Sequence, residues 1–131
     1  MNASEKKELV KYRIGKAKDT FSEVEVLIQN KFLNNAVNRL YYASFYAVSA
    51  LFIERNIQAK SHAGTKQMFG LHFVKTGIIS KESGDFFTLI FDMRHTGDYD
   101  DYIIFEQQEV VSLLKPAIDF ITQIEEILSI D

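Results

Sequence analysis

The sequence contains no cysteine and no tryptophan, and its 131 residues include only one proline and six glycines. Without cysteine, a disulfide, a thiolate metal ligand and a cysteine nucleophile are all excluded. Hairpins need frequent turn residues, so the scarcity of proline and glycine favours helices. No stretch approaches 18 consecutive apolar residues, and residues 1–8 are not followed by the apolar run of a secretory signal. We therefore expect a cytoplasmic protein that does not contact a membrane.

The residues that are present have an ordinary globular balance. Apolar residues make up 47% of the chain and charged residues 25%, which is too hydrophobic for a disordered protein. A chain of this length can bury one sizeable core, so we expect a single domain over residues 1–131. The formal net charge of -3 argues against a broad basic surface, so any nucleic-acid contact must be local.

Two long segments carry apolar residues at alternating spacings of four and three, which is the pattern of an amphipathic helix. The first predicts a helix over residues 4–30 with Ser4 as its N-cap. The second predicts a helix over residues 106–129, with a kink at Pro116 because proline lacks the backbone donor. The apolar face of each of these helices needs another helix to cover it.

The segment between them predicts three more helices. Residues 34 or 35 to 55 are apolar on almost every side and form the central helix. A helix over residues 61–76 is capped by Ser61 and ended by Gly77. The fourth helix opens at Ser80 or Ser83 and stops at Gly97, before a loop over residues 97–105. The expected fold is all-α, an antiparallel up-and-down bundle of about five helices.

Few residues carry recognisable chemistry. The only histidines are His62, His72 and His95, and none stands at a metal-ligand spacing. The chain has neither a GxSxG nucleophile elbow nor a phosphate-binding GxxxxGK[ST] loop. We therefore predict no metal and no cofactor.

The densest polar stretch runs from Arg94 to Tyr102 and holds a guanidinium, an imidazole, three carboxylates and two phenols. In the functional interpretation, Arg94 presents its planar donors to a phosphate, while Asp98 and Tyr99 shape the pocket. In the structural interpretation, Arg94 and His95 stabilise the C-terminal end of a helix, and Asp98 pairs with Arg94 in a solvated acidic loop.

Two further residues are candidates for the same site. Arg39 lies in the aromatic-rich central helix and needs a partner if buried, which Asp98 or another acidic residue of the loop would supply. Arg39 and Tyr42 would then line the pocket of Arg94; alternatively, Arg39 extends to solvent from the helix edge. His62 follows the predicted cap and is either a catalytic residue or a histidine at a helix end with no catalytic role.

Three segments together resemble the HEPN domain family. They are residues 38–47 (NRLYYASFYA), 61–64 (SHAG) and 94–100 (RHTGDYD). The resemblance extends over roughly residues 5–129. It implies an antiparallel bundle of about five helices, usually a homodimer, often encoded beside a minimal nucleotidyltransferase as a toxin-antitoxin pair.

Many members of this family are metal-independent ribonucleases whose motif joins an arginine, a polar residue and a histidine a few residues further on. Here Arg94 and His95 match the first two positions, whereas the positions for the histidine hold Tyr99, Asp100 and Asp101. Because cleavage through the 2'-hydroxyl needs a proton acceptor with a pKa near neutrality, efficient ribonuclease activity is not expected. By resemblance, Tyr99 or Tyr102 is a possible target of modification by the nucleotidyltransferase.

The sequence leads to three hypotheses. The first is a dimeric HEPN protein that binds a nucleotide or an RNA phosphate in a nucleotidyltransferase-associated module. The second is a metal-independent endoribonuclease toxin that uses Arg94 with His95 or His62 as the base. The third is a structural module whose acidic loop binds a basic partner protein.

Overall fold

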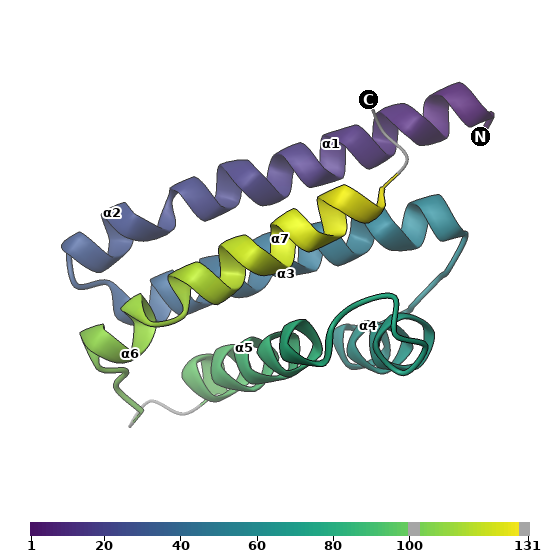
Figure 1. Cartoon of the computed structure of the whole chain (residues 1–131). Coiled ribbons are helices and arrows are strands. Elements are labelled where there is room, and N and C mark those ends of the chain that lie inside the picture. Colours follow the sequence, from purple (N-terminus) through teal and green to yellow (C-terminus); the bar gives the residue numbers. More distant parts are fainter. Residues whose placement is uncertain (100–102, 129–131) are drawn as a thin grey trace.

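The computed structural model describes residues 1–99 and 103–128, and every regular element among them is a helix. In chain order these elements are α1 (Ala3–Ser22), α2 (Val24–Gln29), α3 (Leu33–Arg55), α4 (His62–Phe69), the π-helical η1 (Gly70–Val74), α5 (Lys81–Tyr99), α6 (Gln107–Val111) and α7 (Leu114–Ile127). Three pairs of neighbouring elements are separated by two residues at most, so the described elements form five rods, which are α1–α2, α3, α4–η1, α5 and α6–α7 (Figure 1). The prediction of an all-α bundle of about five helices is confirmed.

α3 is the centre of this bundle, and α1, α5 and α7 all pack against it. Successive long rods run in opposite directions, so α1 and α5 point one way while α3 and α7 point the other (Figure 1). Four alanines of α3, at positions 36, 43, 47 and 50, have no exposed surface and allow close approach of its neighbours. The predicted role of this segment as the central helix is confirmed.

Aromatic rings join the second half of the chain to this centre. Phe69, Phe87 and Phe120 belong to α4, α5 and α7, and all three are buried. The rings of Phe87 and Phe120 stack with their centroids 5.5 Å apart, and that of Phe69 lies 5.2 Å from Phe87. This cluster holds α4 and α5 together beside α3.

The first rod differs from its prediction at two points. The N-cap is Asn2 rather than Ser4, because the Asn2 Oδ1 accepts a hydrogen bond of 2.8 Å from the Glu5 N–H. The helix is also interrupted at Glu23. There the Ser22 hydroxyl donates to the Asp19 carbonyl, and the Glu23 N–H turns to Thr20 instead.

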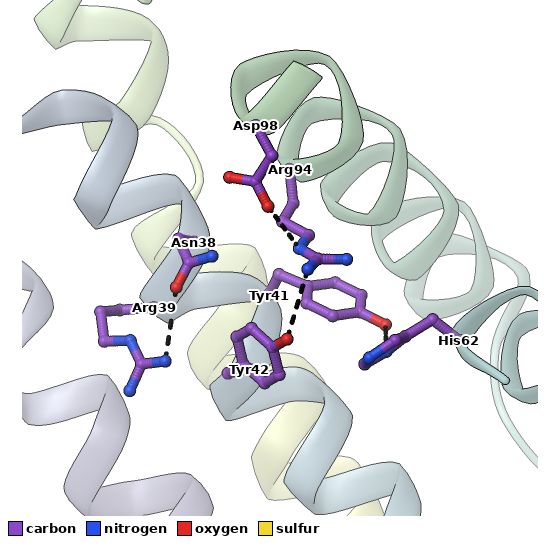
Figure 2. A network of polar contacts seen from close by, with 7 residues as sticks. All are labelled: Asn38, Arg39, Tyr41, Tyr42, His62, Arg94 and Asp98. Atoms are coloured by element: carbon purple, nitrogen blue, oxygen red, sulfur yellow. Dashed lines mark hydrogen bonds and ion pairs between the residues drawn. The ribbon is translucent and has the colours of Figure 1, made fainter.

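α4 begins where the sequence indicated. The Ser61 hydroxyl accepts a hydrogen bond of 2.9 Å from the Gly64 N–H, which confirms the predicted cap. The helix continues through the π-helical η1 and a turn that contains Gly77, whose φ of 81° suits only glycine. The capping places His62 in the first turn of α4, directed toward α3 (Figure 2).

α5 extends further than predicted. Gly97 does not stop it, and the helix continues to Tyr99. This glycine makes room for a side chain from the following segment, since a Cβ there would lie 2.9 Å from Cε2 of Phe105. The extension puts Asp98 one helical turn beyond Arg94, on the same face.

The last rod is divided into α6 and α7 by Ser112 and Leu113. Pro116 is the third residue of α7, where a helix needs no backbone donor, and its ring is incompatible with a hydrogen bond to the Ser112 carbonyl. The predicted kink is therefore a break, four residues before the proline. No helix in the described part of the chain is long and apolar enough to cross a membrane.

Candidate functional site

Arg94 lies one turn before the end of α5, with its side chain turned inward toward α3 (Figure 2). Its Nη2 donates a hydrogen bond of 3.3 Å to the Tyr42 hydroxyl, and its Nε lies 3.0 Å from Oδ2 of Asp98. Only 18% of the Arg94 side chain is exposed, against 34% for Asp98. The predicted pairing of Asp98 with Arg94 is confirmed, although within a helix rather than with a loop.

The guanidinium of Arg94 packs over two tyrosine rings. Its Cζ atom lies 5.2 Å from the ring centroid of Tyr41 and 5.4 Å from that of Tyr42. Such contacts attract a cation to the negative face of the ring, and their strength increases as water is excluded. The charge of Arg94 is therefore held in a partly desolvated place with a defined orientation.

His62 reaches the same cluster from the start of α4. Its Nδ1 and the Tyr41 hydroxyl share a hydrogen bond of 2.7 Å, and its ring centroid lies 4.8 Å from that of Phe45. Burial lowers the pKa of His62 below its ordinary value, and the positive charge of Arg94 lowers this pKa further. The imidazole is thus favoured in its neutral form, in which one ring nitrogen can accept a proton.

Tyr41 connects Arg94 to His62, and the sequence analysis did not single it out. The residue is fully buried, and this burial raises the pKa of its phenol, while Arg94 lowers this pKa and Tyr42 raises it. The hydroxyl therefore remains protonated, and it can donate or accept the hydrogen bond that it shares with Nδ1 of His62. A signal was available, because a tyrosine in a helix that is apolar on all sides must find a partner for its hydroxyl.

Arg39 reaches Tyr42 from a different side than Arg94 does (Figure 2). Its Cζ lies 5.2 Å from the Tyr42 ring centroid, and its Nη2 donates a hydrogen bond of 3.3 Å to Oδ1 of Asn38. The acidic residue near it is Glu23, whose Oε2 is 4.0 Å from Nη1. Of the predicted partners, Asp98 is engaged by Arg94 instead, and the other acidic residues of the predicted loop lie outside the described residues.

A cavity of about 580 Å³ opens on the side of Arg39 that faces α1 and α2. Its lining residues come from the junction of α1 with α2 and from the first turns of α3, and they are Ser22, Glu23, Val26, Leu27, Asn35, Asn38 and Arg39. A second cavity of about 510 Å³ follows α1 and shares Glu23 and Arg39 with the first. Arg39 and Arg94 thus share the ring of Tyr42, but Arg39 also faces this separate space.

The remaining predicted site residues are His95, Tyr99 and Tyr102. His95 is exposed and projects about 100° round α5 from Arg94, so the structure does not place it with Tyr41 and Tyr42. Tyr99 is the last residue of α5, but its side chain lies outside the described part, as does Tyr102 with the acidic residues before it. Within that part, no group of three or more histidine and acidic side chains could hold a metal ion.

The family model of the HEPN domain matches residues 10–127, a stretch that includes the whole Arg94 cluster. The chain belongs to the HEPN domain family. Its HEPN domain therefore contains the central helix α3, the start of α4 with His62, and the end of α5 with Arg94.

Relatives of this HEPN chain are found in bacteria and archaea. A protein of Thermotoga maritima named "UPF0332 protein" is 36% identical over 125 residues, which cover 95% of each chain. Methanocaldococcus jannaschii has a relative named "Putative toxin MJ0605", 34% identical over 78% of this chain and 83% of its own length. A second relative there, "Putative toxin MJ0142", is 33% identical over 94% of this chain and 83% of its own length.

Proposed function

We propose that this HEPN protein binds the phosphate of a nucleotide or an RNA through Arg94, as a component of a toxin-antitoxin-like module. The observation that carries the proposal is the inward guanidinium, fixed over Tyr41 and Tyr42 and already paired with a carboxylate. A planar guanidinium recognises a phosphate with the same donors that recognise a carboxylate.

Asp98 occupies the position that the phosphate would take. Its carboxylate is an oxyanion beside Nε, so the geometry suits an anion there. Asp98 is more exposed than Arg94 and can turn toward solvent when a more highly charged anion binds. In this proposal Tyr42 donates its hydroxyl to the ligand, because its oxygen already lies beside Nη2 of Arg94.

The test is calorimetry with ADP and with short RNAs. We expect binding that Arg94→Ala removes and that Arg94→Lys retains only in part, since lysine lacks the planar fork. The matched control is Arg55→Ala at the far end of α3, an exposed arginine that lies beside its neighbour Glu54 and over the ring of Phe73. Binding that Arg94→Ala leaves unchanged would disprove the assignment.

In the proposed module the chain binds two protein partners. One is a second copy of itself, and the other is a minimal nucleotidyltransferase. Both are features that the HEPN family implies, and the two relatives whose names contain the word toxin support a toxin-like role. Light scattering during gel filtration measures the mass of the assembly, with a dimer expected. Co-purification with a nucleotidyltransferase encoded beside the gene tests the second contact. A monomer that retains no such enzyme would contradict this part.

A second candidate is a metal-independent ribonuclease with His62 as the base, and the cluster of Arg94, Tyr41 and His62 favours it. In this reaction Nδ1–H of His62 donates to the Tyr41 oxygen, and Nε2 accepts the proton of the 2'-hydroxyl, whose oxygen attacks the phosphorus. The bond to the 5'-oxygen breaks, and that oxygen takes the proton back from the His62 imidazolium while a cyclic phosphate remains. Arg94 stabilises the charge on the phosphorus centre.

Cleavage of RNA in the presence of a chelator distinguishes the two candidates. If the nuclease hypothesis holds, His62→Gln abolishes cleavage and His95→Gln, on the exposed side of α5, leaves it intact. Growth arrest on expression would also be relieved by Arg94→Ala. Cleavage that depends on His95 instead would overturn the role of His62, and binding without cleavage would leave phosphate recognition alone.

A further inference from the structure

We propose that the cavity between α2 and α3 is a nucleoside site, which receives the base and ribose of the ligand whose phosphate Arg94 binds. This inference rests on the proposed function and deepens it, because it assigns the ligand to the class of nucleosides that carry phosphates. The cavity lies on the side of Tyr42 where Arg39 is, and the Arg94–Asp98 pair lies on another side of that ring.

The cavity lies where the first rod is interrupted. Ser22 and Glu23 stand between α1 and α2, and they line the cavity together with residues from the first turns of α3. Its volume of about 580 Å³ is in the range of pockets that enclose small organic ligands.

The lining of the cavity suits a nucleoside. Val26 and Leu27 provide apolar surface for the face of a base, while Asn35 and Asn38 bring amides that both donate and accept hydrogen bonds. The carboxylate of Glu23 can accept hydrogen bonds from ribose hydroxyls or from an exocyclic amino group. A wholly apolar ligand would displace water from these polar groups without replacing its hydrogen bonds and is disfavoured.

Arg39 provides the connection to the phosphate site. It lines the cavity, and its guanidinium contacts the same Tyr42 ring that Arg94 contacts. Its ion pair with Glu23 is long, at 4.0 Å, and both side chains are partly exposed, so the pairing is weak and Arg39 can turn to an anion. A phosphate chain that leaves the cavity would therefore pass Arg39 and Tyr42 before it reaches Arg94.

The experiment compares ADP with inorganic pyrophosphate, which carries linked phosphates but no nucleoside. We expect wild-type protein to bind ADP about tenfold more tightly than pyrophosphate, the effect of one or two hydrogen bonds with apolar contact. Asn35→Leu keeps the branched shape of the side chain and removes one amide of the lining. It should remove most of the preference for ADP and leave pyrophosphate affinity unchanged, whereas Arg94→Ala should weaken both ligands.

Asn34→Leu is the matched control, because Asn34 is an exposed neighbour on α3 that is not part of the cavity lining. NMR provides a readout independent of affinity: ADP should shift the side-chain amide signals of Asn35 and Asn38, and pyrophosphate should not shift Asn35. A tetranucleotide RNA with a 5'-phosphate is a further probe. Tighter binding of ADP would identify the ligand as a free nucleotide, and tighter binding of the tetranucleotide would identify it as RNA.

Equal affinity for ADP and pyrophosphate would overturn the nucleoside site, as would an Asn35→Leu variant that keeps the full preference for ADP. In both cases the phosphate site stands if binding still depends on Arg94. If ADP, pyrophosphate and the RNA all fail to bind, the proposed function itself fails, and the nucleoside site fails with it.

Discussion

Arg94 controls the chemistry of its surroundings because its charge is held in a place with little water. Its partners are Asp98, Tyr41 and Tyr42, and its field also reaches His62. A guanidinium in such a position favours anions and disfavours a second positive charge. The charge of Arg94 therefore helps burial to keep the imidazole of His62 neutral, whereas burial alone outweighs this charge and keeps the phenol of Tyr41 protonated.

The first prediction concerns the pH dependence of stability. The pKa of His62 is lower in the folded protein than in the unfolded chain, so the unfolded chain binds the proton more readily. The stabilisation is fully present above the unfolded pKa of about 6.5 and is lost as the pH falls toward the folded value. The melting temperature should therefore decrease between about pH 7 and about pH 5.

His62→Gln should reduce this decrease, and His72→Gln, at an exposed position on η1, should leave it as in the wild type. Thermal unfolding followed by circular dichroism at several pH values measures both. A His62→Gln variant with the same acid sensitivity as the wild type would show that other groups are responsible.

The second prediction concerns the hydroxyl of Tyr41. Tyr41→Phe keeps the buried ring and removes the hydrogen bond to His62, so we expect a loss of about 1 kcal/mol in the free energy of unfolding. Urea unfolding gives this value. Tyr12→Phe, at a position that is 59% exposed, is the control and should change the stability by much less. Equal effects of the two variants would contradict the structural role of the hydrogen bond.

At the scale of elements, side chains decide where helices break. Ser22 diverts one backbone hydrogen bond at the end of α1, and Pro116 removes another at the start of α7. Glycine has a different role in α5, where it provides space for a neighbouring side chain. The predicted helix end at Gly97 is wrong for this reason. A glycine that ends a helix and a glycine that makes room for a neighbour look the same in the sequence.

The third prediction compares two glycines inside helices. A Cβ at Gly84 in α5 would lie 2.8 Å and 2.9 Å from the two Cγ atoms of Val74, whereas a Cβ at Gly15 in α1 meets nothing within 4 Å. Valine is too short and stiff to move aside easily. Gly15→Ala should stabilise the protein by about 1 kcal/mol, since alanine is the better helix former.

Gly84→Ala should instead destabilise the protein by about 1 kcal/mol, because the steric cost exceeds the gain in helix propensity. Denaturant midpoints of the two variants, measured against the wild type, provide the comparison. Stabilisation by Gly84→Ala would mean that η1 moves away from α5 without cost.

At the scale of the whole molecule, the bundle depends on one aromatic cluster. Phe120 of α7 contacts Phe69 and Phe87, and these three rings join the last rod to α4 and α5. The same packing keeps the start of α4 beside α3, where His62 and Tyr41 share a hydrogen bond. Stability and the geometry of the candidate site therefore have a common origin.

The fourth prediction is that Phe120→Ala costs about 3–5 kcal/mol, as expected for truncation of a buried aromatic side chain. Ile118→Ala, two residues away and 48% exposed, is the control and should cost far less. Chemical unfolding measures both, and Phe120→Leu is the milder variant if Phe120→Ala does not fold. Similar costs for Ile118→Ala and Phe120→Leu would contradict the role of the cluster.

The sequence by itself determined the helices, the central position of α3 and the candidate residues Arg94, Tyr42 and His62, because helical periodicity and unusual polar side chains are local signals. Only the tertiary structure decided that Tyr41 joins His62 to Arg94, that Glu23 rather than Asp98 faces Arg39, and that a cavity opens where α1 ends. These features depend on which faces of separate helices meet, and residues far apart in the chain set that arrangement through packing.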